Sequence, residues 1–419
     1  MHARLVELGG SGVRVCRLGK DRAGEIRLTR FLHNPAVTVT EMVATAAART
    51  STRVTGRHVL AIQDTTMVRS AAEGIGVALH PLIAVDAVDG TLFGLLDARF
   101  FIRQGGQRNE RRERDLAQKE SGRWLEAAQR AAELAAVGAA CVTVVSDREG
   151  DIYEDFADKP SAVEMLVRAG QDRRLADGSH LFAKARMLPE AGRMAVDLPA
   201  APGRRARTAI VSLRFCRVEI ARPKHRTSGA RAALPRAVAL SLVEATEINP
   251  LAGVDGAHWR LLTTHAVNDV ADARRIVDFY RQRWTIEQLF RTLKTHGFNV
   301  EALRQAEDGP FERLVAASLI AAVTVLQLVR ERDGVAKRPL EDAFDPDDRP
   351  ALEAISADLE GKTAKQKNPH PKGSLAFAAW VFARLGGWSG YYGKPGPVVI
   401  LHGLTRFQAI KHGWALRNV

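Results

Sequence analysis

Two aspartates at the ends of apolar segments give the first indication of the chemistry available to this chain. Asp64 ends the run VLAIQD and Asp147 ends the run VTVVSD. A carboxylate at the end of a buried strand loses hydration energy unless a positive group meets it, so each aspartate is either a cap for the following turn or a ligand. If the two strands are parallel neighbours, both carboxylates reach one edge of a sheet.

A third carboxylate, Glu287, lies in a segment with helical periodicity that begins at Asn268 or Asp269 and runs to about Thr295. At about 100° per residue, one narrow stripe of this helix carries a phenol, a carboxylate and three bases. The stripe consists of Tyr280, Arg283, Glu287, Arg291 and Lys294. The face that packs on the sheet consists of Phe279, Ile286, Leu289, Phe290 and Leu293. On an exposed helix, the same stripe would be only a ladder of ion pairs.

The segment YRQRWTIEQLFRTLK, residues 280–294, resembles the Tyr-x2-Arg-x3-Glu-x6-Lys signature of bacterial cut-and-paste DDE transposases of the insertion-sequence-four family, with every spacing intact. Further blocks are similar to that family and stand in its order: AIQDTT (61–66), KESGRWL (119–125), SDREGDIYE (146–154) and WRLLTT (259–264). The resemblance covers roughly residues 40–419 and is weakest between 171 and 254.

The resemblance implies an RNase-H-like fold in which Asp64, Asp147 and Glu287 are the catalytic residues and hold two Mg²⁺ or Mn²⁺ ions. Carboxylate oxygens suit these hard cations, which accept phosphate oxygens as further ligands. A pair of such ions activates the attacking oxygen and stabilises the leaving oxygen in phosphoryl transfer. The histidines show no ligand spacing that would predict a zinc site.

The resemblance also implies DNA contacts by residues outside the acidic set: Tyr280, Arg283, Lys294, Arg168, Trp259, Trp284 and Arg291. Arg283 and Lys294 would contact phosphates near the scissile bond, and Tyr280 would donate a hydrogen bond to a phosphate oxygen. Trp259 and Trp284 would serve a flipped base, since an aromatic face stabilises an extruded nucleotide. For Trp259, a place in the core at the start of its strand is the alternative.

The elements that must position these residues predict an α/β protein, with an RNase-H-like mixed-sheet core interrupted by an all-β insertion and flanked by helical regions. Strands are expected at 58–63, 140–147, 164–169 and 258–264, a hairpin around Asp89-Gly90, and a helix from about Glu113 to Ala136. The expected segments are an N-terminal helical region for DNA end binding (1–57), the first part of the core (58–170), a basic β-rich insertion (171–254), the second part of the core (255–304) and a C-terminal helical region for dimerisation (305–419).

The composition is that of an ordinary globular protein, since 46% of the 419 residues are hydrophobic and 26% are charged. That excludes a wholly disordered, collagen-like or disulfide-scaffold chain. The three cysteines, Cys16, Cys141 and Cys216, form no CxxC pair. The longest apolar run, 314–329, is shorter than the roughly 20 residues of a membrane span, so it predicts a buried helix. Without a visible secretory signal, we expect a cytoplasmic protein with no membrane partner.

The charge balance predicts a polyanionic partner. Lys and Arg total 61 against 48 acidic residues, giving a net charge of +13. Between Gly203 and Arg236 ten bases face a single acid, Glu219. Such a lopsided run repels itself unless an anion meets it, and DNA is favoured over a membrane because no basic amphipathic helix accompanies the charge.

These observations predict a transposase that cleaves and joins DNA strands at the terminal repeats of an insertion-sequence element and at target DNA. The resemblance implies a cut-and-paste reaction, a hairpin intermediate and a homodimer in the synaptic complex. Fewer residues precede Asp64 than in the family, which favours the alternative of a catalytically silent DNA-binding protein or inhibitor; retention of all three carboxylates opposes it. A host RNase-H-like nuclease would not need the basic insertion.

Overall fold

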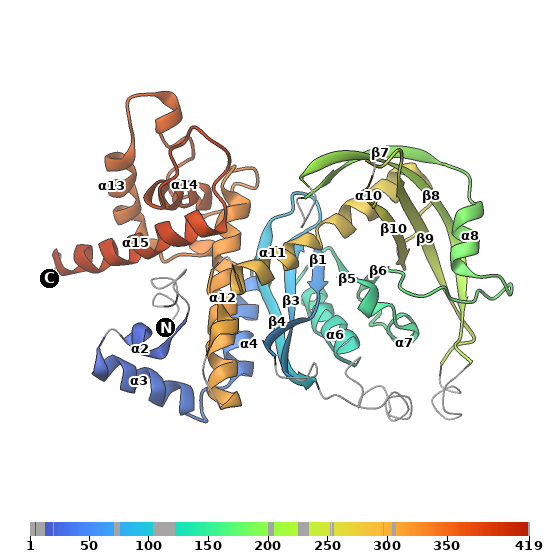
Figure 1. Cartoon of the computed structure of the whole chain (residues 1–419), viewed down its shortest axis with the longest axis horizontal. Helices are drawn as coiled ribbons and strands as arrows, with labels where there is room; N and C mark the ends of the chain where they lie inside the picture. Colours follow the sequence, from blue (N-terminus) through green and yellow to red (C-terminus); the bar gives the residue numbers. More distant parts are fainter. Residues whose placement is uncertain are drawn as a thin grey trace. The chain divides into compact units, whose positions relative to one another are not determined.

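The computed structural model describes residues 5, 13–19, 21–70, 76–103, 122–199, 205–224, 234–251, 253, 255–295, 297–303 and 307–417, which form two compact units. Unit 1 comprises Met1–Arg53, Thr65–Gly105 and Trp284–Val419. Unit 2 comprises Val54–Asp64 and Gly106–Arg283. Figure 1 gives the element labels used below. The expected helix start at Glu113 and the first three residues of KESGRWL lie outside the described residues.

Unit 2 is built on a mixed sheet with the strand order β1-β5-β6-β10-β9-β8-β7. Its strands are β1 (His58–Gln63), β5 (Cys141–Ser146), β6 (Glu164–Arg168), β7 (Gly192–Leu198), β8 (Arg207–Ala221), β9 (Ala237–Glu247) and β10 (His258–Thr263). The first three in this order run parallel, and every following pair is antiparallel. The centre of β1, residues 59–62, is fully buried, as expected of a parallel strand covered on both faces. The predicted strands are therefore confirmed.

The helices of unit 2 pack on different parts of this sheet. They are α6 (Gly122–Ala136), α7 (Tyr153–Ala157), α8 (Leu181–Met187) and α10 (Val270–Arg281), with the 3₁₀ turn η3 (Arg148–Gly150). α6 packs against β1 and β5, and α10 packs against β8 and β9. α10 begins where the sequence predicted, because the Asp269 side chain accepts a hydrogen bond from the Asp272 amide at 2.8 Å. A mixed sheet flanked by helices confirms the predicted α/β class and is consistent with an RNase-H-like core.

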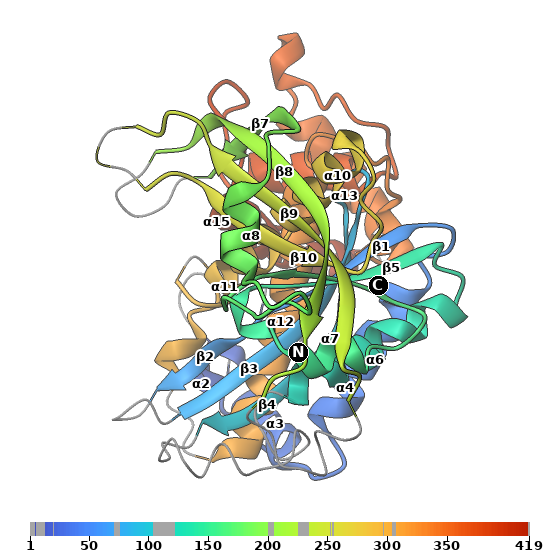
Figure 2. The ribbon, with the colours of Figure 1, turned by 90° about the vertical axis from the view of Figure 1, so that its right-hand side faces the viewer.

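The β-rich insertion extends the sheet of unit 2. β10 pairs with β9, β9 with β8 and β8 with β7, and Figure 2 shows the long strands β8 and β9 side by side. The prediction of an all-β insertion is wrong in one place, because α8 interrupts it. Leu181 and Ala185 are buried four residues apart, which is helical spacing, so this short segment packs as a helix.

The predicted single helix from about 268 to 295 is also wrong, because it is two helices. α10 ends at Arg281, and α11 (Trp284–Leu293) begins after Gln282 and Arg283. The amide of Gln282 donates to the Phe279 carbonyl at 3.1 Å, and that of Arg283 donates to Tyr280 at 3.0 Å. These bonds span three residues rather than four and tighten the end of α10. The stripe deduced for one continuous helix therefore does not exist as such.

Unit 1 contains an antiparallel sheet of β2 (Thr66–Ser70), β3 (Gly76–Asp86) and β4 (Leu92–Arg103). The hairpin predicted at Asp89-Gly90 is confirmed between β3 and β4. Gly90 has a φ of 72°, a conformation that glycine adopts without steric cost. The Asp86 carboxylate accepts from the amides of Val88 and Asp89, which fixes the turn.

The longest helix of unit 1, α12 (Asp308–Glu331), is mostly buried. In the described residues it alone is long and apolar enough to cross a membrane by length and composition, and 83% of its most apolar window is buried in the protein. The other helices and turns of unit 1 are α2 (Val15–Gly19), α3 (Arg22–His33), α4 (Val39–Ser51), η4 (Val300–Ala302), η5 (Leu340–Asp342), η6 (Pro346–Asp348), α13 (Arg349–Leu359), η7 (Ala364–Gln366), α14 (Leu375–Leu385) and α15 (Pro397–Arg417).

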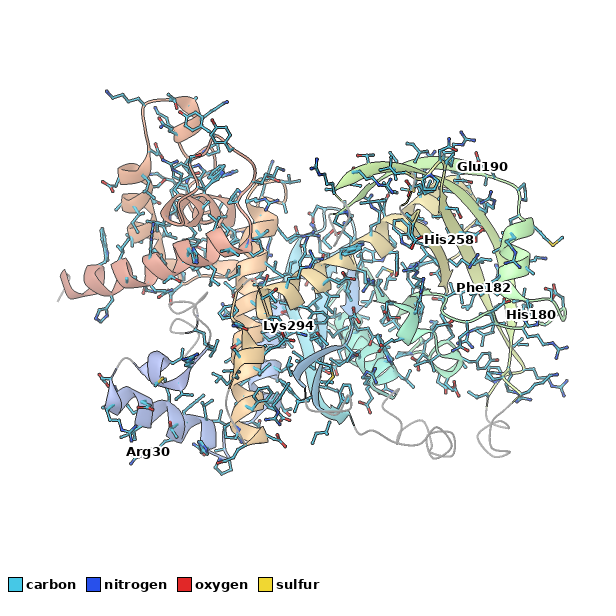
Figure 3. All side chains as sticks on the ribbon, viewed as in Figure 1. Arg30, His180, Phe182, Glu190, His258 and Lys294 are labelled. Carbon is cyan, nitrogen blue, oxygen red and sulfur yellow. The ribbon has the colours of Figure 1, made fainter. Side chains whose placement is uncertain are left out.

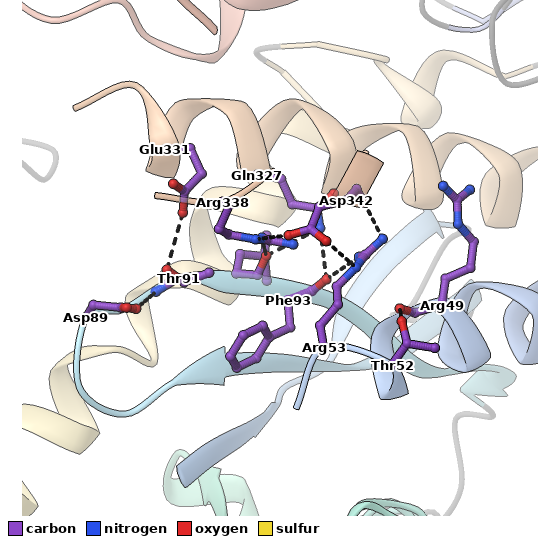
Figure 4. A network of polar contacts seen from close by, with 11 residues as sticks. Arg49, Thr52, Arg53, Asp89, Thr91, Phe93, Gln327, Glu331, Arg338 and Asp342 are labelled. Atoms are coloured by element: carbon purple, nitrogen blue, oxygen red, sulfur yellow. Dashed lines mark hydrogen bonds and ion pairs between the residues drawn. The ribbon is translucent and has the colours of Figure 1, made fainter. Parts of the chain in front are cut away.

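A polar network ties the end of α4 to β4 and η5 (Figure 4). Arg53 donates to the Phe93 carbonyl at 2.7 Å and pairs with the Asp342 carboxylate at 3.4 Å. Gln327 of α12 donates to the same Phe93 carbonyl at 2.8 Å, and Arg338 also binds Asp342. Burial lowers the pKa of Arg53 to about 10. The network thus joins segments of unit 1 that lie far apart in sequence.

Candidate active site

The ends of β1 and β5 bring Asp64 and Asp147 to one edge of the unit 2 sheet. The two strands are parallel neighbours, and Ile62 lies opposite Val145 in their register. Continued for two residues, this register places Asp64 opposite Asp147. The two strands are therefore parallel neighbours, the arrangement that would bring both carboxylates to one edge of the sheet.

Asp64 forms a sheltered ion pair with Arg283. Nη1 of Arg283 lies 2.9 Å from Oδ2 of Asp64 and donates a hydrogen bond to it. The Asp64 side chain is only 14% exposed, and the Arg283 side chain is 11% exposed. Water screens such a pair weakly, so the guanidinium compensates a carboxylate that the end of an apolar strand would otherwise leave poorly hydrated. Arg283, expected at a phosphate, here neutralises one of the two strand-end aspartates.

Asp147 caps the turn that follows β5. Its Oδ1 accepts a hydrogen bond from the Glu149 amide at 2.8 Å, at the start of η3. Its Oδ2 makes no hydrogen bond to the part of the chain that the structure describes. Asp147 can therefore be both a cap and a ligand, because Oδ1 caps the turn and Oδ2 remains able to bind a cation.

Tyr280 lies beside this edge, in the last turn of α10. It is 3% exposed, and its buried hydroxyl makes no hydrogen bond of ordinary geometry to a described residue. Burial raises the pKa of the phenol, and the Asp147 carboxylate adds to the rise. The positive charges of Arg283 and Arg168 act in the opposite direction. The Arg283 guanidinium is 5.8 Å from the centre of the Tyr280 ring, within cation–π range.

Arg168 and Trp259 complete this part of unit 2. Arg168 ends β6 and donates through Nη2 to the His258 carbonyl at 2.9 Å. Burial lowers the pKa of Arg168, and the positive charge of the nearby Arg148 lowers it further. Trp259 is 9% exposed, with its ring 6.2 Å from that of Tyr280. The burial of Trp259 favours the core interpretation over a base pocket.

Asp151, in the same block as Asp147, has a purely structural environment. It is buried and accepts hydrogen bonds from the amides of Gly170 and Gln171 at 2.8 and 3.0 Å. Its other oxygen is 2.7 Å from Nε of Arg173. These bonds fasten the loop after β6 and occupy both carboxylate oxygens, so Asp151 holds this loop in place.

The second half of the signature belongs to unit 1. Trp284 and Glu287 are half-buried on α11, and Arg291 is exposed. Lys294, labelled in Figure 3, follows α11. Its Nζ lies 2.8 Å from Oε1 of Glu301 in η4. The boundary between the units falls between Arg283 and Trp284, so the meeting of Glu287 with the two aspartates stays a prediction.

The donors at the strand ends suit a hard cation. Within the described residues of either unit, no three His, Cys, Asp or Glu side chains are grouped as a ready-made metal site. Asp64 and Asp147 nevertheless supply carboxylate oxygens from one sheet edge, the ligand type that Mg²⁺ and Mn²⁺ prefer. The pair fits one side of such a site, provided that the cation displaces Arg283 from Asp64.

Comparison with known protein families adds an independent finding. The model of the family described as "Transposase DDE domain" matches residues 87–323, which is more than half of the chain. The matched range includes Asp147 and Glu287 and begins after Asp64. Together with the mixed α/β core, this match shows that the chain belongs to the transposase DDE domain family.

Proposed function

We propose that this transposase cleaves and joins DNA strands by metal-dependent phosphoryl transfer, in the manner of the insertion-sequence-four family. One observation carries the proposal: Asp64 and Asp147 stand in register at the ends of parallel neighbours in a chain of this family. The intact spacing of Tyr280, Arg283, Glu287 and Lys294 supports it further.

Asp64, Asp147 and Glu287 would hold two divalent cations, Mg²⁺ or Mn²⁺. When bound, such ions stabilise the charge that develops on the attacking and leaving oxygens of an in-line displacement. The protein's own contribution is to hold the carboxylates on rigid elements. Asp64 and Asp147 sit at the ends of a hydrogen-bonded strand pair, and Asp147 is fixed further by its cap.

Several basic and aromatic side chains would bind and orient DNA. Arg283 would exchange Asp64 for a phosphate oxygen once a cation takes over the neutralisation of Asp64. The Tyr280 hydroxyl, which lacks an ordinary partner, would donate to a phosphate oxygen. Arg291 on α11 and Lys294, directly after α11, would contact the DNA backbone. Of the two tryptophans, the half-buried Trp284 is better placed than the buried Trp259 to stack on an extruded base.

The finer steps follow from the resemblance. The 3′-hydroxyl freed by the first cut would attack the phosphodiester of the opposite strand, closing a hairpin that water then reopens before the end is joined to target DNA. The reaction would take place in a homodimer bound to the element's terminal repeats, with residues 305–419 contributing to dimerisation and residues 1–57 to end recognition.

A strand-cleavage assay tests this proposal. The full chain is incubated with duplex DNA that carries the terminal repeats of its element, with Mg²⁺, Mn²⁺ or EDTA. We expect nicking that requires the cation and that Glu287→Gln abolishes, while Glu133→Gln, an exposed acid on α6, retains it. Cleavage by Glu287→Gln at the wild-type rate would overturn the catalytic assignment.

The ion pair of Asp64 with Arg283 favours a second candidate, a catalytically silent DNA-binding protein. In such a protein the pair would be permanent and purely structural. The same assay separates the two functions, because a silent protein binds the terminal repeats and cuts them with neither cation.

A further inference from the structure

A cavity lies in the C-terminal part of unit 1, where the end of α12 and the segment around η7 meet α14 and the loop after it. The cavity has a volume of about 480 Å³. Two indoles and four basic side chains are prominent in its lining: Trp380, Trp388, Arg332, Lys365, Lys367 and Lys394. We call this cavity the C-terminal pocket.

Positive charge in the C-terminal pocket exceeds negative charge. The one carboxylate in its lining is that of Asp333, which pairs with Lys394 at 2.7 Å. Lys367 makes no ion pair in the described parts of the chain. Arg332 donates to the Pro395 carbonyl at 2.8 Å, and its buried Nε has no hydrogen-bond partner among the described residues. A partly desolvated cation with an unused donor is stabilised by an anion.

The surrounding sequence strengthens this imbalance. The last acidic residue of the chain is Glu360, and the 59 residues from 361 to 419 contain nine bases and no acid. The segment that builds most of the C-terminal pocket is therefore as strongly basic as the β-rich insertion.

The two indoles give the pocket a flat apolar side. Trp380 is 4% exposed and lies under the Arg384 guanidinium at 5.7 Å. Trp388 is half-buried, and its indole N–H donates to the carbonyls of Tyr392 and Gly393, both at 3.2 Å. These bonds fix the plane of the Trp388 ring while part of the ring stays accessible. A fixed aromatic face beside several cations is the combination that binds a base and its phosphate.

We propose that the C-terminal pocket binds one nucleotide of DNA, with its base against Trp388 and its phosphate among Arg332, Lys365 and Lys367. Stacking tolerates any base, and the cations recognise only phosphate, so the site is independent of sequence. The proposal rests on the proposed function only in taking DNA as the partner. It gives the C-terminal region a direct role in holding DNA, in addition to dimerisation.

Fluorescence anisotropy of the full chain with labelled single-stranded and duplex DNA tests the cations, in EDTA so that no cleavage is needed. Lys365→Ala with Lys367→Ala should weaken binding about fivefold or more and reduce the slope of log K against log salt by about 1 for each lost phosphate contact. The matched control, Lys362→Ala with Lys372→Ala, removes the same charge from the same acid-free segment outside the pocket. Equal affinities for the two double variants would overturn the proposal.

Photo-crosslinking and two substitutions of Trp388 test the stacking. Single-stranded DNA containing 5-iododeoxyuridine should crosslink to the peptide that contains Trp388, and Trp388→Phe should retain more affinity than Trp388→Ala, with thermal unfolding as the check on folding. Competition by dAMP, but not by inorganic phosphate, would show that the C-terminal pocket also binds a free nucleotide and that it requires the base as well as the phosphate. Crosslinks confined to other peptides would refute the site. Because Asp64→Asn should crosslink like the wild type, a failure of catalysis and a failure of this proposal are distinguishable.

Discussion

Arg283 and Asp64 show how a guanidinium can neutralise a carboxylate at the end of a buried strand. Their sheltered ion pair means that a cation must compete with the guanidinium for the oxygens of Asp64. The sequence identified both residues, because both belong to recognisable patterns. It did not predict their pairing, because the two positions are 219 residues apart and only the folded chain joins them.

Replacing Arg283 should therefore strengthen metal binding while weakening DNA binding. Without the competing guanidinium, Arg283→Gln is expected to bind Mn²⁺ at least about tenfold more tightly, since hydrogen bonds to charged groups contribute roughly 1.5–3 kcal/mol. Isothermal titration of the DNA-free protein measures this. Arg281→Gln, which replaces a half-buried arginine that pairs with Asp278, is the control. An unchanged Mn²⁺ affinity of Arg283→Gln would show that the pair does not guard the site.

Tyr280→Phe separates a functional hydroxyl from a structural one. The hydroxyl is buried without an ordinary hydrogen bond, so its removal should leave the free energy of unfolding unchanged or raise it by about 1 kcal/mol. DNA cleavage should nevertheless fall by about tenfold, the loss expected for one hydrogen bond to a phosphate. Urea unfolding and single-turnover cleavage provide the two measurements. A large loss of stability with unchanged cleavage would assign Tyr280 to the core.

At the scale of elements, the sequence predicted what local patterns determine. The buried strands β1 and β5 are continuous apolar runs, and the cap at Asp269 stands directly before α10. The break between α10 and α11 escaped prediction because neither Gly nor Pro marks it and apolar periodicity continues through it. Its cause is a local change in hydrogen bonding at Gln282 and Arg283, which the periodicity of apolar residues does not reveal. The short helix α8 was not predicted because the insertion around it has the short alternating runs that are typical of strands.

α7 carries a prediction about stability and pH. Asp155 is 1% exposed, and its carboxylate has no hydrogen-bond partner in the described chain. Burial, with the nearby acids Glu154 and Asp158, raises the pKa of Asp155 to about 8 from its ordinary 3.8. At a pH between 3.8 and about 8, Asp155 is protonated in the folded protein and ionised in the unfolded chain. This residue's contribution therefore favours folding least above pH 8.

Asp155→Asn should remove that pH dependence. Near pH 9 we expect the variant to exceed the wild type in unfolding free energy by on the order of a few kcal/mol, and near pH 4 by little. Urea unfolding at pH 4, 7 and 9 measures the difference, and Glu133→Gln, which replaces an exposed acid on α6, is the control. A difference that is the same at every pH would contradict the raised pKa.

At the scale of the whole molecule, charge is the property that the sequence conveys best. The net charge of +13 and the basic insertion predicted a polyanionic partner, in agreement with membership of a transposase family. The acid-free segment 361–419 went unnoticed, because its bases are spread among apolar residues. Only the folded unit 1 brings some of these bases together around two indoles.

The insertion should contribute to DNA binding through its exposed arginines. Arg217 on β8 is exposed, and Arg217→Ala should reduce the salt-dependence slope of duplex binding by about 1. Arg130→Ala on α6, where the arginine pairs with Glu133, should leave the slope unchanged. Identical slopes for the two variants would show that this face of β8 stays away from DNA.

We propose that Asp64, Asp147 and Glu287 meet around the same cations. Fe²⁺ can take the place of Mg²⁺ at such a site and, with ascorbate and peroxide, cut the protein backbone beside its ligands. We expect cuts near all three positions in the DNA-bound protein, suppressed by excess Mg²⁺ and by Asp147→Asn. Cuts near residues 64 and 147 but never near 287 would contradict it.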